Sequence, residues 1–308
     1  MSKLDEYKFK DRLIKGISDQ GDFKISVVKT TELVQEAVER HQLGVLSSVL
    51  LGRTLTASLL LASELKGEER IQLRFDGDGP VGMILAEANS VGEVRGYVRH
   101  PQATLSEDAL LDQEPRTGSG VGLGLGIGVL NVSKTLYNEA EPRNSSIEII
   151  NGDITQDIAF YLTQSEQIPS AVMLDISLND QGEILQAGGL LIQRLPSAKE
   201  NVMDRLSESL KNFHSISSLL EEGEYIDSIM HNAAGDFGVR ELDRRPVHFF
   251  CRCSRERFIR GLAMLPYDEL KELEGEEQEL VCQYCSTKER ITEEEIAQLA
   301  FEAKAALN

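Results

Sequence analysis

The pattern of hydrophobic and polar positions changes its period along the chain, and each change predicts a different kind of element. A strand beginning at Lys24 gives way to a helix over 32–40, for which Thr31 is the predicted N-cap. A longer, apolar helix is predicted over about 43–64. The period then becomes two, which indicates strands over 71–75, 81–88 and 93–99.

The segment 118–128 places a glycine at every second position, with apolar residues between them from Val121 onward. A nucleotide-binding loop is one interpretation, but Leu123 and Leu125 stand where the last glycine of Gly-x-Gly-x-x-Gly belongs, and no Gly-Lys-Ser/Thr follows. We therefore predict a strand with one bare backbone face that another element approaches closely. The segment 76–80 is interpreted as a turn and not as a calcium loop, because Pro80 fills the third acidic position.

Further strands and one helix complete the first part of the chain. A strand is predicted over 146–150, followed by a helix to about residue 164 with Asp153 or Thr155 as its cap. Two more strands are predicted over 171–178 and 183–195. Strand-rich sequence with interspersed helices indicates an α+β core domain over 1–196.

The helical period returns beyond the core domain. Ser197 and Glu200 have the spacing of a capping box. One amphipathic helix is predicted to run from there to Gly223, and a shorter one to end at Gly235. We expect this helical linker, 197–244, to dock on the core domain through its apolar stripe. The stripe consists of Val202, Leu206, Leu210, Phe213, Ile216 and Leu220.

Composition narrows the class of protein. With 308 residues, 41% hydrophobic and 27% charged, the chain is long enough for two folded domains and is not disordered. A net charge of −19 argues against binding to nucleic acid or to an anionic membrane. The N-terminus lacks the apolar region of a secretory signal, and the apolar span 45–62 contains Arg53 and several hydroxyl residues, as a buried helix does.

The cysteines carry the candidate chemistry. A Cys-x-Cys pair and a Cys-x-x-Cys pair, separated by 28 residues, fit a tetrahedral metal site, and four thiolates favour one structural zinc ion. Four reduced core cysteines or two disulfides are the alternatives, and His248 is an alternative ligand. The lobe that holds the cysteines, 245–308, ends in a helix that a capping box of Thr292 and Glu295 opens. The predicted ligands are Cys251, Cys253, Cys282 and Cys285.

The sequence gives little support to an enzymatic or a nucleic-acid-binding function. Zinc with four thiolates has no open position for water, and no separate nucleophile motif is present, so an enzyme is not expected. Arginines cluster beside the first pair, but 251–290 contains seven basic and nine acidic residues. We interpret these arginines as neutralising the thiolates, which leaves nucleic-acid binding as an alternative only. The cysteines cluster in an otherwise cysteine-free chain, which indicates a reducing compartment, so we predict a cytoplasmic protein.

The first cysteine pair differs from an ordinary zinc ribbon because a single residue separates its members. A Cys251–Cys253 disulfide would close a very small ring, which is strained and reducible and therefore suits a reversible redox element. Structural zinc contributes roughly 10–16 kcal/mol, whereas a whole domain is stable by only about 5–15 kcal/mol. Oxidation that destroys the ligands should therefore unfold the lobe.

Several stretches resemble the heat-shock protein 33 family of redox-regulated chaperones, over most of the chain. The most specific is the zinc-centre sequence, CRCSRERFIRGLAMLPYDEL followed after an acidic loop by VCQYC. The core domain also resembles the family. Its matching stretches are SEQIPSAVMLDISLNDQGEILQAGGLLIQRLP (165–196), GDGPVG (77–82) and GYVRHP (96–101).

The resemblance implies an ATP-independent holdase that binds unfolding client proteins under oxidative and heat stress. It implies an inactive, monomeric form when the chain is reduced and zinc-bound. Oxidation is then expected to pair Cys251 with Cys253 and Cys282 with Cys285, release zinc, loosen the linker and produce a homodimer. The alternative that the residues leave open is a zinc ribbon that acts constitutively as a docking surface for protein or nucleic acid.

Overall fold

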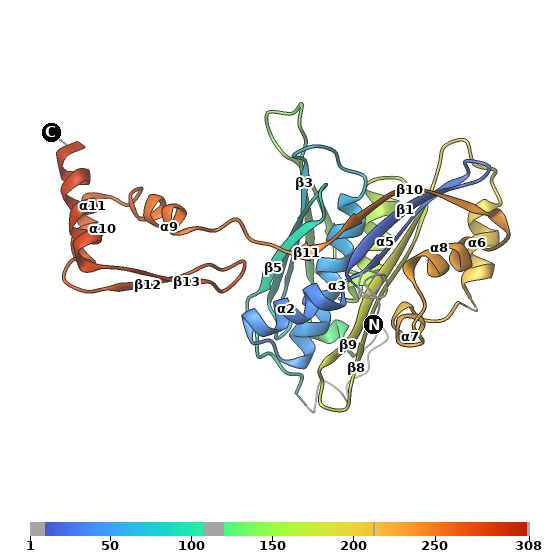
Figure 1. Ribbon diagram of the computed structural model, residues 1–308, viewed down its shortest axis with the longest axis horizontal. Helices are drawn as coiled ribbons and strands as arrows, with labels where there is room; N and C mark the ends of the chain where they lie inside the picture. Colours follow the sequence, from blue (N-terminus) through green and yellow to red (C-terminus); the bar gives the residue numbers. More distant parts are fainter. Residues whose placement is uncertain (1–9, 107–119, 212, 307–308) are drawn as a thin grey trace, which may run out of the picture. The chain divides into compact units, whose positions relative to one another are not determined.

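Figure 1 shows the computed structural model of the protein, which describes residues 10–106, 120–211 and 213–306. The chain forms two compact units, Met1–Phe250 and Cys251–Asn308. Helices and strands are interspersed in both, so the predicted α+β class is confirmed. The predicted division into a core domain, a helical linker and a zinc lobe is based on the roles of these parts and not on compactness. It remains a prediction.

The first unit contains a five-stranded sheet that is antiparallel throughout. Its strands at 23–29, 170–178 and 184–194 were predicted from the sequence, but those at 12–18 and 239–246 were missed. The strand at 12–18 is buried along most of its length and shifts register between Lys15 and Gly16, so it lacks the alternation by which strands are recognised. In spatial order the strands are β10 (Val239–Pro246), β1 (Arg12–Ser18), β2 (Phe23–Lys29), β9 (Ile184–Arg194) and β8 (Ser170–Leu178).

A six-stranded sheet forms the second layer of the same unit. One edge pairing, between β11 and β5, is parallel, and the other pairings are antiparallel. Buried and more exposed residues alternate along β3 and β5, so one face of this sheet packs inward, as the period of two predicts. In spatial order the strands are β11 (His248–Phe249), β5 (Glu93–Val98), β4 (Met83–Asn89), β3 (Arg70–Gly77), β6 (Gly128–Thr135) and β7 (Arg143–Glu148).

The apolar helix α3 (Val45–Ala62) lies between the two sheets and contacts strands of both. Glycines let the strands approach it: a Cβ at Gly96 of β5 would lie 3.1 Å from Leu55, and one at Gly189 of β9 would lie 2.8 Å from Thr56. Among the described residues, α3 alone is long and apolar enough to cross a membrane, yet 83% of it is buried in the protein. The sequence prediction of a buried core helix is confirmed.

The helix α2 (Thr31–His41) begins one residue away from its predicted cap. Thr30 occupies the N-cap position but makes no side-chain capping bond, and Thr31 is the first helical residue. Instead, Asp11 Oδ2 accepts a hydrogen bond of 2.8 Å from the backbone amide of Leu33. A carboxylate from a distant strand end therefore does the capping, which local sequence cannot reveal.

The glycine-rich segment does not form the predicted strand over the residues that the structure describes; positions 118 and 119 lie outside them. It forms a short 3-10 turn, η1 (Gly122–Gly124), before β6 begins. The expected close approach of another backbone is confirmed, because a Cβ at Gly122 would lie 2.1 Å from the carbonyl oxygen of Asn151. Asn151 precedes α5 (Ile154–Gln164), and the Asp153 side chain caps this helix as predicted.

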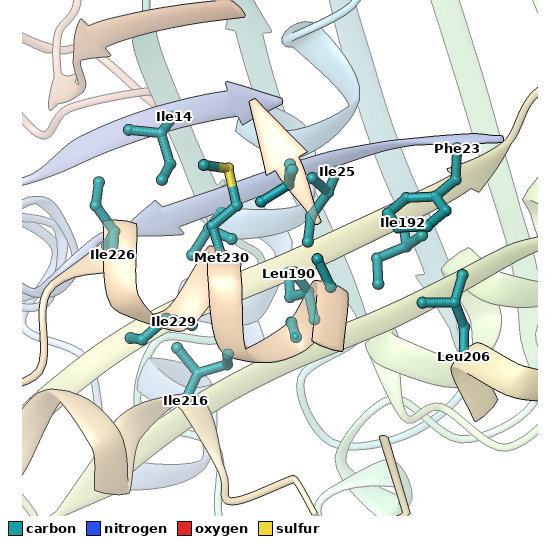
Figure 2. Close-up of a cluster of buried hydrophobic side chains, with 14 of the residues drawn as sticks. Ile14, Phe23, Ile25, Leu190, Ile192, Leu206, Ile216, Ile226, Ile229 and Met230 are labelled. Carbon is teal, nitrogen blue, oxygen red and sulfur yellow. The ribbon is translucent and has the colours of Figure 1, made fainter. Parts of the chain in front are cut away.

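Three linker helices cover the face of the five-stranded sheet opposite α3 (Figure 1). They are α6 (Val202–Leu210), α7 (Ile216–Glu221) and α8 (Ile226–Ala234). Figure 2 shows their apolar side chains meeting those of β1, β2 and β9. We call this contact the linker cluster. Its fully buried members include Ile14, Phe23, Ile25, Val27, Leu190, Ile192, Leu206, Ile216, Ile229 and Met230.

The linker differs in two details from the helix predicted over 197–223. Two helices replace one because Ser215 starts a new helix, its side chain accepting a hydrogen bond from the amide of Ser218. The predicted capping box of Ser197 and Glu200 does not form, since α6 begins after Asn201 and the Ser197 hydroxyl donates to the carbonyl of Gly21. The apolar stripe was nevertheless correct, because both helices bury it against the same sheet.

The second unit is built from short elements around a small core. The predicted capping box is confirmed: the amide of Glu295 donates to Thr292 Oγ1, and the amide of Thr292 donates to Glu295. Only six buried residues form the core cluster in the described part of this unit: Leu262, Leu270, Ile291, Ile296, Leu299 and Ala300. The elements are α9 (Arg255–Leu262), α10 (Tyr267–Glu272), β12 (Gln278–Val281), β13 (Lys288–Ile291) and α11 (Glu293–Ala306).

Candidate metal centre

The structure brings the four cysteines of the sequence prediction together. Cys251 and Cys253 lie just before α9, and Cys282 and Cys285 lie in the tight connection between β12 and β13. In this connection the amide of Ser286 donates to the carbonyl of Cys282 at 2.8 Å, and Ser286 has a left-handed φ of 56°. The tight turn directs both sulfurs of the second pair toward the first pair.

The four sulfur atoms are spaced as a tetrahedral metal site requires. All lie within 4.8 Å of one another. The Sγ atoms of Cys251 and Cys282 are 3.8 Å apart, and those of Cys253 and Cys285 are 3.4 Å apart. Four sulfurs each about 2.3 Å from a central zinc ion would be separated by about 3.8 Å. All four cysteines are present as thiols and not as disulfides, so this donor set fits a soft divalent ion.

The pKa values of the cysteines also indicate that the cluster needs a nearby positive charge. Burial, together with contacts to Cys285 and Cys251, raises the pKa of Cys253 to about 12. Burial likewise raises the pKa of Cys282 to about 11. Burial acts in the same direction on Cys285, but hydrogen bonds from Thr287 and from neighbouring thiols outweigh it and lower the pKa to about 7. Crowded sulfurs cannot all ionise without a nearby positive charge, which a bound metal ion supplies.

Thr287 was not identified from the sequence as part of this site. Its hydroxyl lies 3.2 Å from the Sγ of Cys285, and its carbonyl oxygen accepts a hydrogen bond of 2.9 Å from the amide of Cys282. It therefore orients both cysteines of the second pair. Its position two residues after a Cys-x-x-Cys is the only signal in the sequence, and threonine is too common in turns for that to be diagnostic.

The alternative ligand and the neighbouring arginine have other partners. His248 lies in β11 of the first unit, paired with Glu93, and is not in the four-cysteine group. Arg255 binds carboxylates: its Nη2 lies 2.7 Å from Glu295, and its Nη1 lies 3.3 Å from Glu289. It also donates to the carbonyl of Arg290, so it fixes α9 against β13 and α11.

A second candidate functional region is the polar border of the linker cluster. Asp175 of β8 accepts hydrogen bonds from the amide of Ser217, at 3.0 Å, and from its hydroxyl, at 2.5 Å. These bonds hold the first turn of α7 on the sheet. Arg244 of β10 forms an ion pair with Asp227 in the first turn of α8. Sequence reasoning identified the apolar stripe but none of these polar contacts, because each joins residues far apart in the chain.

Comparisons with known proteins agree with this architecture. The family model described as "Hsp33 protein" matches residues 11–292. A 33 kDa chaperonin of Streptococcus gordonii is 37% identical over 293 residues, covering 94% of this chain and 98% of that protein. One from Streptococcus pneumoniae is 36% identical over the same length. The crystal structure of the 33 kDa chaperonin of Thermotoga maritima matches with a TM-score of 0.85 and 30% identity, over 96% of this chain and 99% of that one.

Proposed function

The chain belongs to the Hsp33 family of chaperones, and we propose that it is a redox-regulated, ATP-independent holdase. In this proposal the reduced form is inactive and carries one zinc ion on Cys251, Cys253, Cys282 and Cys285. The observation that carries it is the position of the cysteine cluster. Four sulfurs within 4.8 Å of one another lie in a unit whose core cluster has only six buried residues.

When bound, zinc would supply a divalent positive charge that keeps the four sulfurs as thiolates and joins the start of the unit to the connection between β12 and β13. A lobe of this size needs such a staple, because so few buried side chains offset the entropy of ordering the residues from Cys251 to Asn308. The protein supplies the geometry through the turn at Ser286 and the contacts of Thr287 and Arg255. Loss of the ligands is therefore coupled to loss of the fold.

Oxidation is the step that removes the ligands. Cys251 and Cys253 lose two electrons to form one disulfide, and Cys282 and Cys285 lose two more to form the other. With hydrogen peroxide as the oxidant, each pair of thiolates reduces one peroxide molecule to two water molecules, and the two protons that this requires come from the solvent. Sulfurs in disulfides no longer bind the metal as thiolates, so the C-terminal unit unfolds.

The proposed client-binding surface is the apolar face under the linker. The linker cluster buries seventeen hydrophobic residues, among them Ile25 and Leu190 of the sheet. If the linker helices leave when the C-terminal unit unfolds, this face becomes available to apolar segments of unfolding proteins, or to a second copy in the proposed oxidised homodimer. Membership of a chaperone family supports both client binding and a role other than that of an enzyme.

A nucleic-acid-binding zinc ribbon is less well supported. Arg255 is engaged by two carboxylates, and the net charge of −19 opposes approach to a phosphate backbone. We therefore retain the redox-regulated holdase as the single proposal.

The test follows three quantities together while the zinc-loaded protein is treated with peroxide under mild warming. They are zinc release, free thiols and suppression of the aggregation of a heat-denatured client. The proposal predicts that one zinc ion leaves as four thiols disappear, and that holding activity rises in step. It also predicts that a reductant with added zinc reverses all three changes.

Two results would contradict the proposal. If the zinc-loaded and the oxidised forms suppress aggregation equally, the cysteines have no regulatory role. If zinc leaves and the C-terminal unit unfolds with no gain in holding activity, the metal only stabilises the fold.

A further inference from the structure

A cavity of about 510 Å³ lies in the first unit, and its lining contains neither a cysteine nor a buried residue of the linker cluster. Strands of both sheets border it, namely β2 and β9 on one side and β6 on the other, together with the C-terminal ends of α3 and α5. Its volume is in the range of small-molecule sites, which are often found between layers of a fold. Neither the cysteine chemistry nor the proposed client surface accounts for it.

The apolar part of the cavity is contributed by several elements. Leu61 comes from α3, Leu162 from α5, Ile168 from the loop after α5, and Leu195 from the end of β9. In the loop after α5, Gln167 has a left-handed φ of 56°, a conformation that non-glycine residues adopt at a cost. This conformation ends α5, where the amide of Ile168 donates to the carbonyl of Leu162 at 2.9 Å, so the loop is held in place at the edge of the cavity.

Charged side chains also line the cavity, and most of them neutralise one another. Lys24 pairs with Glu64 at 2.5 Å, and Lys134 pairs with Glu166 at 2.8 Å. Burial raises the pKa of Glu166, but hydrogen bonds from Lys134 and Tyr161 outweigh it and hold that pKa below the usual range. Both carboxylates are therefore fully used by lysines.

Arg194 is the cationic side chain of the cavity that takes part in neither of these ion pairs. Its Nη2 donates to the carbonyl of Ala198 at 2.8 Å, and no ion pair in the described part of the chain includes it. Its Nε is buried without a hydrogen-bond partner among the described residues. A buried donor without an acceptor is unfavourable, because it has lost its hydrogen bonds to water. The cavity thus has an excess positive charge although the chain carries −19.

We propose that this cavity binds a small organic anion, with its carboxylate at Arg194 and an aliphatic body among Leu61, Leu162 and Leu195. A carboxylate accepts two parallel hydrogen bonds from a guanidinium, and such charge-assisted bonds are about twice as strong as neutral ones. A small rotation of the guanidinium toward the anion would give Nε its missing acceptor. This inference does not depend on the redox proposal.

Octanoate is the probe, titrated into the reduced, zinc-loaded full-length protein by calorimetry. Acetate lacks the aliphatic body, and octylammonium has the opposite charge, so neither should bind. Arg194→Gln should weaken octanoate binding at least tenfold, whereas Arg40→Gln on the exposed face of α2 should leave it unchanged. Leu162→Phe fills the cavity without changing its charge and should abolish binding, which provides a second test if the Arg194 variant does not fold.

We expect one octanoate per chain and a higher temperature of thermal unfolding in its presence. The proposal is overturned if octanoate does not bind, or if octylammonium binds equally well. It is also overturned if several octanoate molecules bind regardless of Arg194→Gln and Leu162→Phe. That last result would indicate that octanoate adsorbs to exposed apolar surface instead of binding in the cavity.

Discussion

The two units differ in what holds them together. In the first unit, α3 lies between two sheets, and the linker helices add a further cluster of seventeen buried hydrophobic residues on the outer face of one sheet. The second unit has a core cluster of six buried residues and a group of four sulfurs. Hydrophobic burial does not depend on the redox state, whereas in the proposed function the second unit depends on thiolates that an oxidant can remove. A redox signal should therefore unfold the second unit, leave the two sheets and α3 intact, and reach the first unit only through its linker helices.

Loss of the metal should have the largest effect of any change, and it should act first on the C-terminal unit. Structural zinc contributes roughly 10–16 kcal/mol, more than a lobe this small can replace. Cys285→Ser, or removal of the metal by a chelator, should abolish hydrogen-exchange protection in α9, α10 and α11 while β1, β2 and β9 keep theirs. Restoring zinc to the chelated wild type is the control. Protection that persists without metal would mean that the six-residue core suffices.

Removal of a buried side chain from the linker cluster should have the next largest effect. Ile229 of α8 is fully buried between the linker and the sheet, so Ile229→Ala should cost about 2–5 kcal/mol in the free energy of unfolding. The reduced variant should also hold clients without any oxidant, because the linker is more weakly docked. Leu242→Ala, at a half-exposed position on β10, is the matched control and should change neither quantity. If the reduced Ile229 variant is destabilised but does not hold clients, docking of the linker does not control holding activity.

The first unit should carry its own dependence on pH, through Asp157. This residue is fully buried in the first turn of α5, and its Oδ1 accepts a hydrogen bond of 2.8 Å from the amide of Ile150. Burial raises its pKa to about 6, and the nearby charge of Asp153 adds to the rise. The unfolded chain gives up this proton at lower pH. The free energy of unfolding should therefore fall by about 3 kcal/mol as pH rises from about 4 to 6.

Asp157→Asn tests this assignment because it removes the titration while preserving the carbonyl acceptor. In urea unfolding of the first unit, the difference between wild type and variant should change across that pH range and level off above it. A constant difference would mean that Asp157 is ionised in the folded protein throughout.

The smallest effect is expected at the polar border of the linker cluster. Asp175→Asn removes the charge from the hydrogen bonds to Ser217, which are worth about 1.5–3 kcal/mol when one partner is charged. The fold should survive, but less peroxide should be needed for activation because α7 is held less firmly. Asp180→Asn, in the exposed turn after β8, should behave like the wild type. An unchanged peroxide requirement would show that apolar contacts alone keep the linker docked.

The elements with a regular pattern were predictable from the sequence. The helix α3, the alternating strands β3 and β5, and the capping box of Thr292 and Glu295 all appear as expected. The doubly buried strand β1 and the glycine-rich turn at η1 were not recognised. Strand β1 lacks the alternation of buried and exposed residues that a strand usually shows, whereas the glycine-rich segment has a period of two without being a strand. These failures have the same cause: the pattern of a segment depends on what covers it, and that is decided by distant parts of the chain.

The candidate site was predictable to a similar extent. The spacing of the cysteines alone identified the four-sulfur group, since few other arrangements satisfy two close pairs. The residues that tune the site and the docking of the linker were not predictable. Thr287 and Asp175 each act through two hydrogen bonds that only the folded structure reveals.

The central claim is that oxidation unfolds the C-terminal unit and releases the linker helices while the sheets remain intact. Hydrogen exchange followed by mass spectrometry, on the zinc-loaded and the peroxide-treated protein, tests this segment by segment. The account predicts that residues 251–306 and the helices α6, α7 and α8 lose protection in the oxidised form, and that β2, β9 and α3 keep it. Continued protection of α6, α7 and α8 in a fully active oxidised protein would contradict the account.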